Sequence, residues 1–191
     1  MPKRKAQGNQ SSALNSATCT VVSSRNVRST LQYPQWRWHL DEVFVKTNGK
    51  LCYLWRAVDH EGEVLEAVVT AKRDKAAALK LLKRIMKKYG RPRTIVTDGL
   101  RAYSAAMKEI GNADRQEVGR GLNNRAENSH QPFRRRERAM QRFRSMKTLQ
   151  KFSAVHAQVH NHFSQERHLV TRQVYKQRRS AALAEWRELV A

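Results

Sequence analysis

The spacing of apolar residues changes sharply near residue 70, and this change limits the folds open to the chain. Before it, apolar and polar residues roughly alternate over 38–45, and apolar runs follow over 51–58 and 64–70. Short turn-forming segments separate these runs, and one of them contains Asn48-Gly49, a pair favoured in tight hairpins. Three strand-like segments joined by short turns predict an antiparallel meander.

After residue 70, segments with helical spacing alternate with short apolar runs. Asp74 can cap a helix over 75–89, and Gly90 and Pro92 can end it. The later elements are predicted as a strand over 93–98, a helix over 102–110, a strand over 115–118 and helices over 125–144, 146–165 and 174–189. Three antiparallel strands followed by alternating elements is the order of the ribonuclease H-like fold, an α/β fold with a mixed sheet and flanking helices. Because one fold hosts many functions, this order alone does not establish function.

The chain divides into three regions by composition. Residues 1–31 are basic, rich in Ser, Thr, Asn and Gln, and without a sustained apolar period, so we predict that they are disordered. Residues 32–145 contain the mixed strands and helices of a single domain, and residues 146–191 form a helical C-terminal extension.

The formal net charge of the chain is +22, which predicts a polyanionic partner, most simply double-stranded DNA. The excess is strongest over 120–191, and its densest patch is Arg134, Arg135, Arg136, Arg138, Arg142 and Arg144. We expect this patch to contact phosphates, although such a run can also be a solvated helix face. No apolar run is long enough to span a bilayer. Two cysteines cannot form a disulfide framework, so we expect the protein to work in a reducing cytosol.

Three acids stand where a buried residue or a helix start would be expected. Asp41 lies within the first predicted strand, Asp98 ends the fourth, and Glu127 lies in the first turns of the helix after it. A carboxylate in a buried strand is costly unless it is paired or binds a metal, and oxygen ligands suit Mg²⁺ or Mn²⁺. The alternatives stay open: Asp98-Gly99 can be only a turn, Asp41 can face solvent, and Glu127 can simply favour a helix N-terminus.

Other polar and aromatic residues favour structural interpretations. The His156/His160 pair could bind a metal, but no carboxylate or cysteine completes a set, so we expect these residues and His162 to face the surface or a partner. Glu42 points to the strand face opposite Asp41, and we therefore do not expect it to be a ligand. We expect core packing for the four tryptophans and for one strand cysteine: Trp36, Trp38, Trp55, Trp186 and Cys52. We expect three asparagines to cap or support the helix that carries Glu127: Asn123, Asn124 and Asn128.

Several blocks of the sequence resemble bacterial insertion-sequence transposases of the DDE class, and most closely the insertion-sequence-six family. The blocks run 38–45, 53–59, 97–103, 123–132 and 134–143, and the tail from 168 to 187 also resembles this family. They occur in order over residues 36–189, which makes the resemblance specific.

This resemblance implies a retroviral integrase-like fold and a DNA-transposing enzyme. Asp41, Asp98 and Glu127 fall on the family's catalytic and metal-binding acids, which would hold two Mg²⁺ or Mn²⁺ ions for strand cleavage and strand transfer. Arg134 falls on a frequently basic position two helical turns after Glu127, where it could contact a DNA phosphate. The implied partners are element ends and target DNA, bound by a homo-oligomer in the bacterial cytoplasm at the nucleoid.

Residues 1–31 do not resemble the family's usual N-terminal helix-turn-helix region, which predicts a truncated or altered N-terminus. The alternative function is therefore a catalytically or biologically inactive transposase remnant that binds DNA without sequence preference. A third hypothesis is a nuclease of the same fold, such as a junction resolvase, that does not transfer strands.

Overall fold

A computed structural model describes residues 37–119, 121–140, 143–163 and 170–190. Its strands are β1 (Arg37–Thr47), β2 (Lys50–Val58), β3 (Val64–Thr70), β4 (Thr94–Thr97) and β5 (Gln116–Val118). Its helices are α2 (Lys75–Tyr89), α3 (Arg101–Glu109), the short 3₁₀ helix η1 (Ala113–Arg115), α4 (Asn124–Met140), α5 (Met146–Phe163) and α6 (Arg172–Val190). The predicted segment 1–31 and Trp36 lie outside the described residues.

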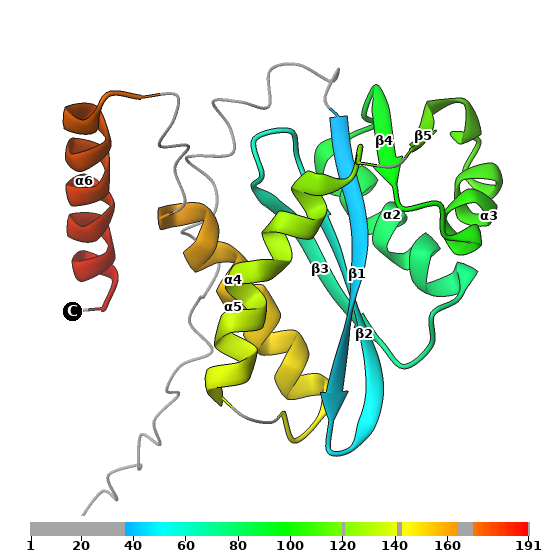
Figure 1. The fold of residues 1–191 in the computed structure, drawn as a ribbon, viewed down its shortest axis with the longest axis horizontal. Coiled ribbons are helices and arrows are strands. Elements are labelled where there is room, and N and C mark those ends of the chain that lie inside the picture. Colours follow the sequence, from blue (N-terminus) through cyan, green and yellow to red (C-terminus); the bar gives the residue numbers. More distant parts are fainter. Residues whose placement is uncertain (1–36, 120, 141–142, 164–169, 191) are drawn as a thin grey trace, which may run out of the picture.

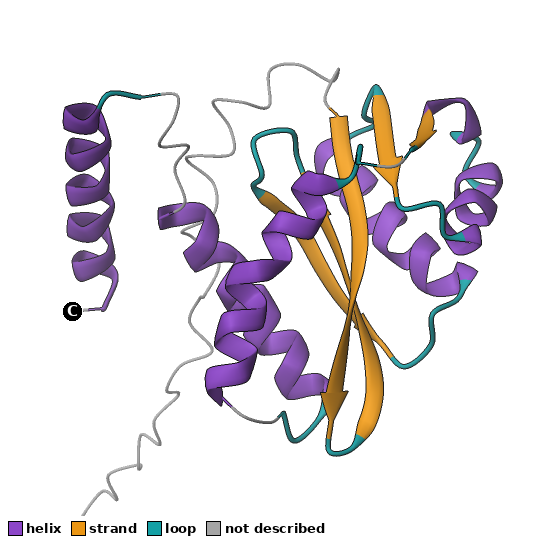
Figure 2. Cartoon of the chain, in the orientation of Figure 1, coloured by secondary structure: helices purple, strands orange, loops and turns teal. Residues whose placement is uncertain are grey.

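The strands form one mixed sheet in the order β3-β2-β1-β4-β5 (Figure 2). The first three strands pair antiparallel, which confirms the predicted meander, whereas β4 and β5 join parallel to β1. The hairpin between β1 and β2 turns at Asn48 and Gly49, which have φ angles of 47° and 78°. Positive φ at both positions is what a tight hairpin turn requires and why the Asn-Gly pair occurs there.

Helices cover both faces of the sheet, as Figure 1 shows: α2 and α3 lie on one side, and α4 and α5 on the other. Because side chains alternate along a strand, β1 contributes Leu40 to the core under α2 and α3, and Val43 to the core under α4 and α5. Trp38 and Trp55 are buried in the first core, as predicted, and Cys52 is buried in the second.

Local capping explains the boundaries of α2, which match the prediction at both ends. The Asp74 side chain accepts a hydrogen bond from the Ala77 N–H at 2.9 Å, and this caps the first turn. The helix ends at Gly90, whose φ of 80° is a conformation that favours glycine.

The edge strand β3 is covered by α5 through two amide side chains. Gln150 accepts from the Val69 N–H and donates to the Ala67 carbonyl, both at 2.8 Å. Asn161 accepts from the Val64 N–H at 2.8 Å and donates to the Val64 carbonyl at 2.9 Å. Satisfied in this way, the edge does not present a free template for another strand, and α5 is fixed in register on the sheet.

The largest difference from a predicted helix boundary lies at the end of α4. The helix expected over 125–144 ends at Met140, and Phe143 instead pairs with Thr47 as an isolated bridge at the β1–β2 hairpin. The Phe143 carbonyl accepts from the Asn48 N–H at 3.0 Å, and the ring is buried. This long-range contact outweighs the local helical preference of the segment. Within the described ranges, none of the helices combines the length and apolarity needed to cross a membrane.

Candidate active site

Sheet topology places Asp41 and Asp98 side by side. In the parallel β1–β4 pair, Leu40 is the register partner of Thr97, so each acid lies one residue beyond a paired position. After Asp98 the chain turns at Gly99, which has a φ of 86°, and the Asp98 carboxylate accepts from the Leu100 N–H at 3.1 Å. The turn interpretation of Asp98-Gly99 is therefore correct, and the same turn holds the carboxylate at the end of β4.

The start of α4 is attached to the same part of β1. The buried Asn123 side chain donates to the Leu40 carbonyl at 2.9 Å, and the Asn123 carbonyl accepts from the Glu127 N–H at 3.2 Å. Asn123 thus connects the residue before Asp41 to the first turn of α4. This contact supports the predicted structural role of Asn123 and brings Glu127 toward β1.

Burial and neighbouring acids act on the carboxyl group of Asp41. The pKa of Asp41 is raised to about 7, mainly by burial and then by the charges of Glu42, Asp98 and Glu127. A hydrogen bond from the Glu42 N–H at 2.9 Å opposes this shift. The Asp41 side chain is 14% exposed, whereas Asp98 and Glu127 are exposed residues. A buried carboxylate with further carboxylates nearby, as Asp41 is, forms a site that a cation would stabilise.

The tightest group of carboxylates contains Asp41, Asp98 and Glu42, with one oxygen of each within 4.8 Å of the others. Glu127 does not belong to this group. Glu42 points to the face opposite Asp41, as predicted, where it forms an ion pair with Arg73 and interacts with Tyr103 of α3. Arg73 also lies 3.7 Å from the Asp98 carboxylate. The positive charge near Glu42 is thus supplied by the chain itself.

Two residues that the sequence analysis did not select lie beside Asp41. His130 of α4 places Nδ1 at 3.7 Å from Asp41 Oδ2, and burial followed by the charges of Arg56 and Arg134 lowers its pKa to about 3. Arg56 of β2 is 2% exposed, and burial lowers its pKa to about 10. It donates to the Ser129 carbonyl of α4 at 2.8 Å. A charged residue inside the apolar run 51–58 was the available signal for Arg56.

The predicted DNA-contacting arginines differ in how free they are. Arg134 is bound to Glu137 at 2.6 Å, one turn along α4. Arg135, Arg136 and Arg138 are exposed on the same helix, and Arg144 is exposed beyond it. Arg142 lies outside the described residues. The phosphate contacts of this patch remain a prediction.

The prediction that the histidines of α5 face the surface or a partner is wrong for His162. This residue is 9% exposed, its Nε2 lies 2.8 Å from the Ala182 carbonyl of α6, and its ring contacts Trp186. His156 and His160 are half-buried and stack on each other with their rings 6.2 Å apart. His156 also hydrogen-bonds to the backbone of Pro132, so this face of α5 packs against α4.

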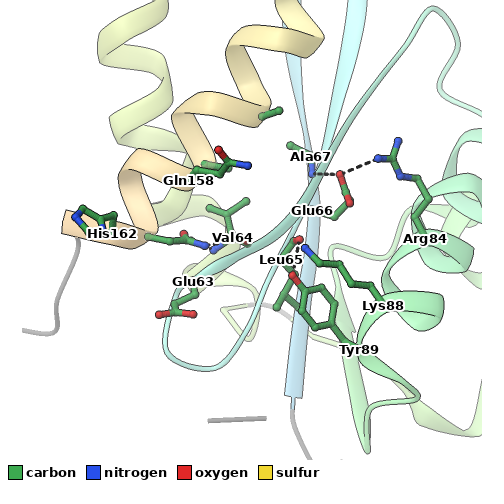
Figure 3. A pocket seen from close by; sticks show the side chains of 13 residues that line it. Glu63, Val64, Leu65, Glu66, Ala67, Arg84, Lys88, Tyr89, Gln158 and His162 are labelled. Carbon is green, nitrogen blue, oxygen red and sulfur yellow. Dashed lines mark hydrogen bonds and ion pairs between the residues drawn. The ribbon is translucent and has the colours of Figure 1, made fainter. Parts of the chain in front are cut away.

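A cavity of about 270 Å³ lies between β3, α2 and α5, away from the acids of the candidate active site (Figure 3). Its lining includes Glu63, Glu66, Arg84 and His162, and none of Asp41, Asp98 and Glu127. The pKa of Glu63 is raised to about 7 by burial and by Asp59 and Glu61. Glu66 is already paired with Arg84 at 3.4 Å. The cavity is therefore separate from the candidate active site.

Comparison with known proteins places this arrangement in a family. A family model described as a DDE domain matches residues 35–166. Two curated relatives from Staphylococcus aureus are the transposase for insertion sequence-like element IS431mec and the transposase for insertion sequence element IS257 in transposon Tn4003. Each is 30% identical over 128 residues, covering 64% of this chain. The chain spans 57% of the length of these relatives.

Among solved structures, the simian T-cell lymphotropic virus intasome in complex with PP2A regulatory subunit B56 gamma matches with a TM-score of 0.55 and 19% identity. The match covers 71% of this chain and 51% of that one. It confirms the predicted ribonuclease H-like, retroviral integrase-like fold. The match of the family model over residues 35–166, most of the chain, shows that the chain belongs to the DDE-domain family of insertion-sequence transposases.

Proposed function

We propose that this chain catalyses metal-dependent DNA strand cleavage and strand transfer of an insertion sequence, with Asp41, Asp98 and Glu127 as its catalytic acids. The observation that supports the proposal is the pairing of Asp41 on β1 with Asp98 at the end of β4, whose carboxylate oxygens lie within 4.8 Å of each other in a chain of net charge +22. The charge of Glu127 on α4 also acts on Asp41. The carboxylates of such a site can bind a divalent cation, while the basic surface of the chain attracts a polyanion such as DNA.

The residues fit a hard divalent cation such as Mg²⁺ or Mn²⁺. Asp41 and Asp98 offer carboxylate oxygens within 4.8 Å of each other, and Glu127 is close enough for its charge to raise the pKa of Asp41. Oxygen-only donor sets are those that these ions prefer. Bound ions would polarise the scissile phosphate and make its attacking oxygen more nucleophilic.

The chain's own residues fix the acids and hold the DNA. Asp41 is held by the Glu42 N–H and Asp98 by the Leu100 N–H, so both carboxylates are oriented before DNA arrives. The exposed Arg135, Arg136 and Arg138 neutralise backbone phosphates along α4. Water attacks the phosphodiester at an element end and releases a 3′-hydroxyl, which then attacks target DNA. We expect a homo-oligomer to bring the two element ends together.

A DNA-cleavage assay tests this proposal. The substrate is a duplex carrying the terminal inverted repeat that flanks the gene, incubated with Mg²⁺ and either the wild type or D98A. We expect nicking by the wild type, loss of nicking in D98A, and little change in DNA binding, because exposed arginines outside the acid cluster supply affinity. The control D114N changes an exposed acid of η1 and should nick normally.

Activity of D98A in Mg²⁺ would refute the catalytic role of this acid. A wild type that binds DNA but never cuts it would instead indicate the binding-only alternative. Nicking without joining to a target duplex would favour a nuclease over a transposase.

A further inference from the structure

The candidate active site contains a buried histidine that neither the family match nor the acid cluster explains. His130 lies on α4 one turn after Glu127, and only 14% of its side chain is exposed. Its Nδ1 faces Asp41 Oδ2 at 3.7 Å. Reaching the usual 2.7–3.2 Å of an N–H···O hydrogen bond needs a shift of roughly half an ångström.

The charge of a buried cation, Arg56, acts on the His130 ring. Arg56 is the register partner of Asp41 on β2, so both side chains project from the same face of the sheet toward α4. Arg56 donates through Nη1 to the carbonyl of Ser129, the residue before His130. Among the described residues, Arg56 Nη2 and His130 Nε2 are both buried polar atoms without a hydrogen-bond partner.

The chemistry of these two atoms makes them complementary. A guanidinium has only donors, whereas a neutral imidazole has one donor and one acceptor. If Arg56 Nη2 donates to His130 Nε2, the ring proton must be on Nδ1, the nitrogen that faces Asp41. A donor that occupies one ring nitrogen thus determines that the proton is carried by the other nitrogen.

We propose that His130 is a positioning residue for Asp41, held by Arg56 in the Nδ1–H tautomer so that it donates to Asp41 Oδ2. The Glu42 N–H already donates to Asp41 Oδ1 at 2.9 Å, so the two donors together fix the plane of the carboxylate. A carboxylate has about four acceptor positions, so lone pairs remain on both oxygens for a cation. Partners that orient a metal-binding carboxylate in this way strengthen metal binding.

This inference rests on the proposed function, because it assumes that Asp41 binds the metal. The first measurement uses the wild-type chain without substitution: long-range ¹H–¹⁵N NMR of His130 in the metal-free protein at neutral pH. We expect the Nδ1–H tautomer. Observation of the Nε2–H tautomer would overturn the proposal, whatever the chain does to DNA.

The second measurement is the affinity of the full-length chain for Mn²⁺ by calorimetry, without DNA. H130N keeps a donor near the position of Nδ1, H130Q moves it to the position of Nε2, and H130A removes it. We expect H130Q and H130A to bind Mn²⁺ about 10–100-fold more weakly, and H130N to stay near the wild type. The control H156N changes another part-buried histidine close to α4 and should bind normally.

Equal Mn²⁺ affinity in the wild type, H130Q and H130A would overturn the positioning role. Equal weakening in all three variants would also overturn it, because the donor position would then not matter. If the wild type binds Mn²⁺ but does not cut DNA, the proposed function fails, while the ranking of these affinities still decides the role of His130.

Discussion

Asp41 and Glu42 are consecutive acids on β1, yet their surroundings are opposite. Glu42 faces α2 and α3, where Arg73 pairs with it and Tyr103 interacts with it. Asp41 faces α4, where it lies beside His130, and it accepts a hydrogen bond from the Glu42 N–H of its own strand. Burial, followed by neighbouring acids, raises the pKa of Asp41 to about 7.

Under the proposed function, this difference separates a structural acid, Glu42, from a catalytic one, Asp41. The charge of Glu42 is compensated by Arg73, whereas the charges of Glu42, Asp98 and Glu127 act on Asp41. The cation on the strand beside Asp41, Arg56, donates instead to the Ser129 carbonyl. A chain that leaves such a group uncompensated loses stability, and residues of this kind concentrate at functional sites. The comparison therefore predicts different responses to the same chemical change at the two positions.

The largest expected effect is on DNA cleavage. Replacing Asp41 by Asn removes a charge and a metal ligand, so we expect nicking in Mg²⁺ to fall by about a thousandfold or more. The nicking rate of E42Q should stay within about tenfold of the wild-type rate, because Glu42 pairs with Arg73 and is not expected to bind the metal. Gel-based nicking rates for both variants test this, and an inactive E42Q would mean that Glu42 is a ligand.

A smaller effect concerns the pH dependence of stability in the metal-free protein. The pKa of Asp41 is about 7 in the folded chain against an ordinary value of 3.8, so the folded state binds the proton more tightly. The resulting stabilisation is complete below about pH 4 and is lost as the pH rises through 7, by at most about 4 kcal/mol. D41N should lack this loss in urea unfolding, and D114N should keep it.

Removing Arg73, the cation that pairs with Glu42, should destabilise the fold on the sheet face opposite Asp41. The Glu42 side chain is only 2% exposed, and the R73M substitution leaves its carboxylate without an ion-pair partner. We expect the free energy of unfolding to fall by about 2–3 kcal/mol when Glu42 is ionised. The loss should shrink as the pH falls, because burial raises the pKa of Glu42 and a protonated carboxyl needs no cation. The double variant R73M/E42Q should recover most of the loss. A stable R73M would show that Glu42 does not need its partner.

The smallest effect is on DNA affinity. The triple variant R135A/R136A/R138A removes three exposed charges beside the site, and the slope of log affinity against log salt should become shallower by up to about 0.9 per lost phosphate contact. The variant K80A/K83A/K87A removes three exposed charges from α2, on the other side of the sheet, and should change the slope less. Equal changes would show that the patch on α4 has no special role.

Local signals in the sequence were sufficient for much of the fold. The Asp74 cap and the Gly90 stop define α2, and Asn48-Gly49 defines the hairpin. The end of α4 could not be predicted, because it depends on the pairing of Phe143 with Thr47 across the fold. The cover of β3 by Gln150 and Asn161 was also unpredictable, since nothing in a sequence tells which strand edge a glutamine or asparagine will reach.

The sequence indicated that Asp41 and Asp98 come together, but not that Glu42 rather than Glu127 completes the tightest carboxylate group, nor which residues surround them. Position in a strand and at a strand end distinguished Asp41 and Asp98, and the opposite face of Glu42 followed from alternation alone. The contact of His130 with Asp41 depends on how α4 crosses the sheet, which in turn depends on Asn123 and Arg56. Such tertiary contacts leave no periodic pattern in the chain.

Anomalous diffraction from crystals of the chain grown with Mn²⁺ tests the contrast between Asp41 and Glu42 most directly. We expect a peak about 2 Å from carboxylate oxygens of Asp41 and Asp98, with the ion pair between Glu42 and Arg73 intact. A peak on Glu42 with Arg73 displaced, or no peak at Asp41, would contradict it.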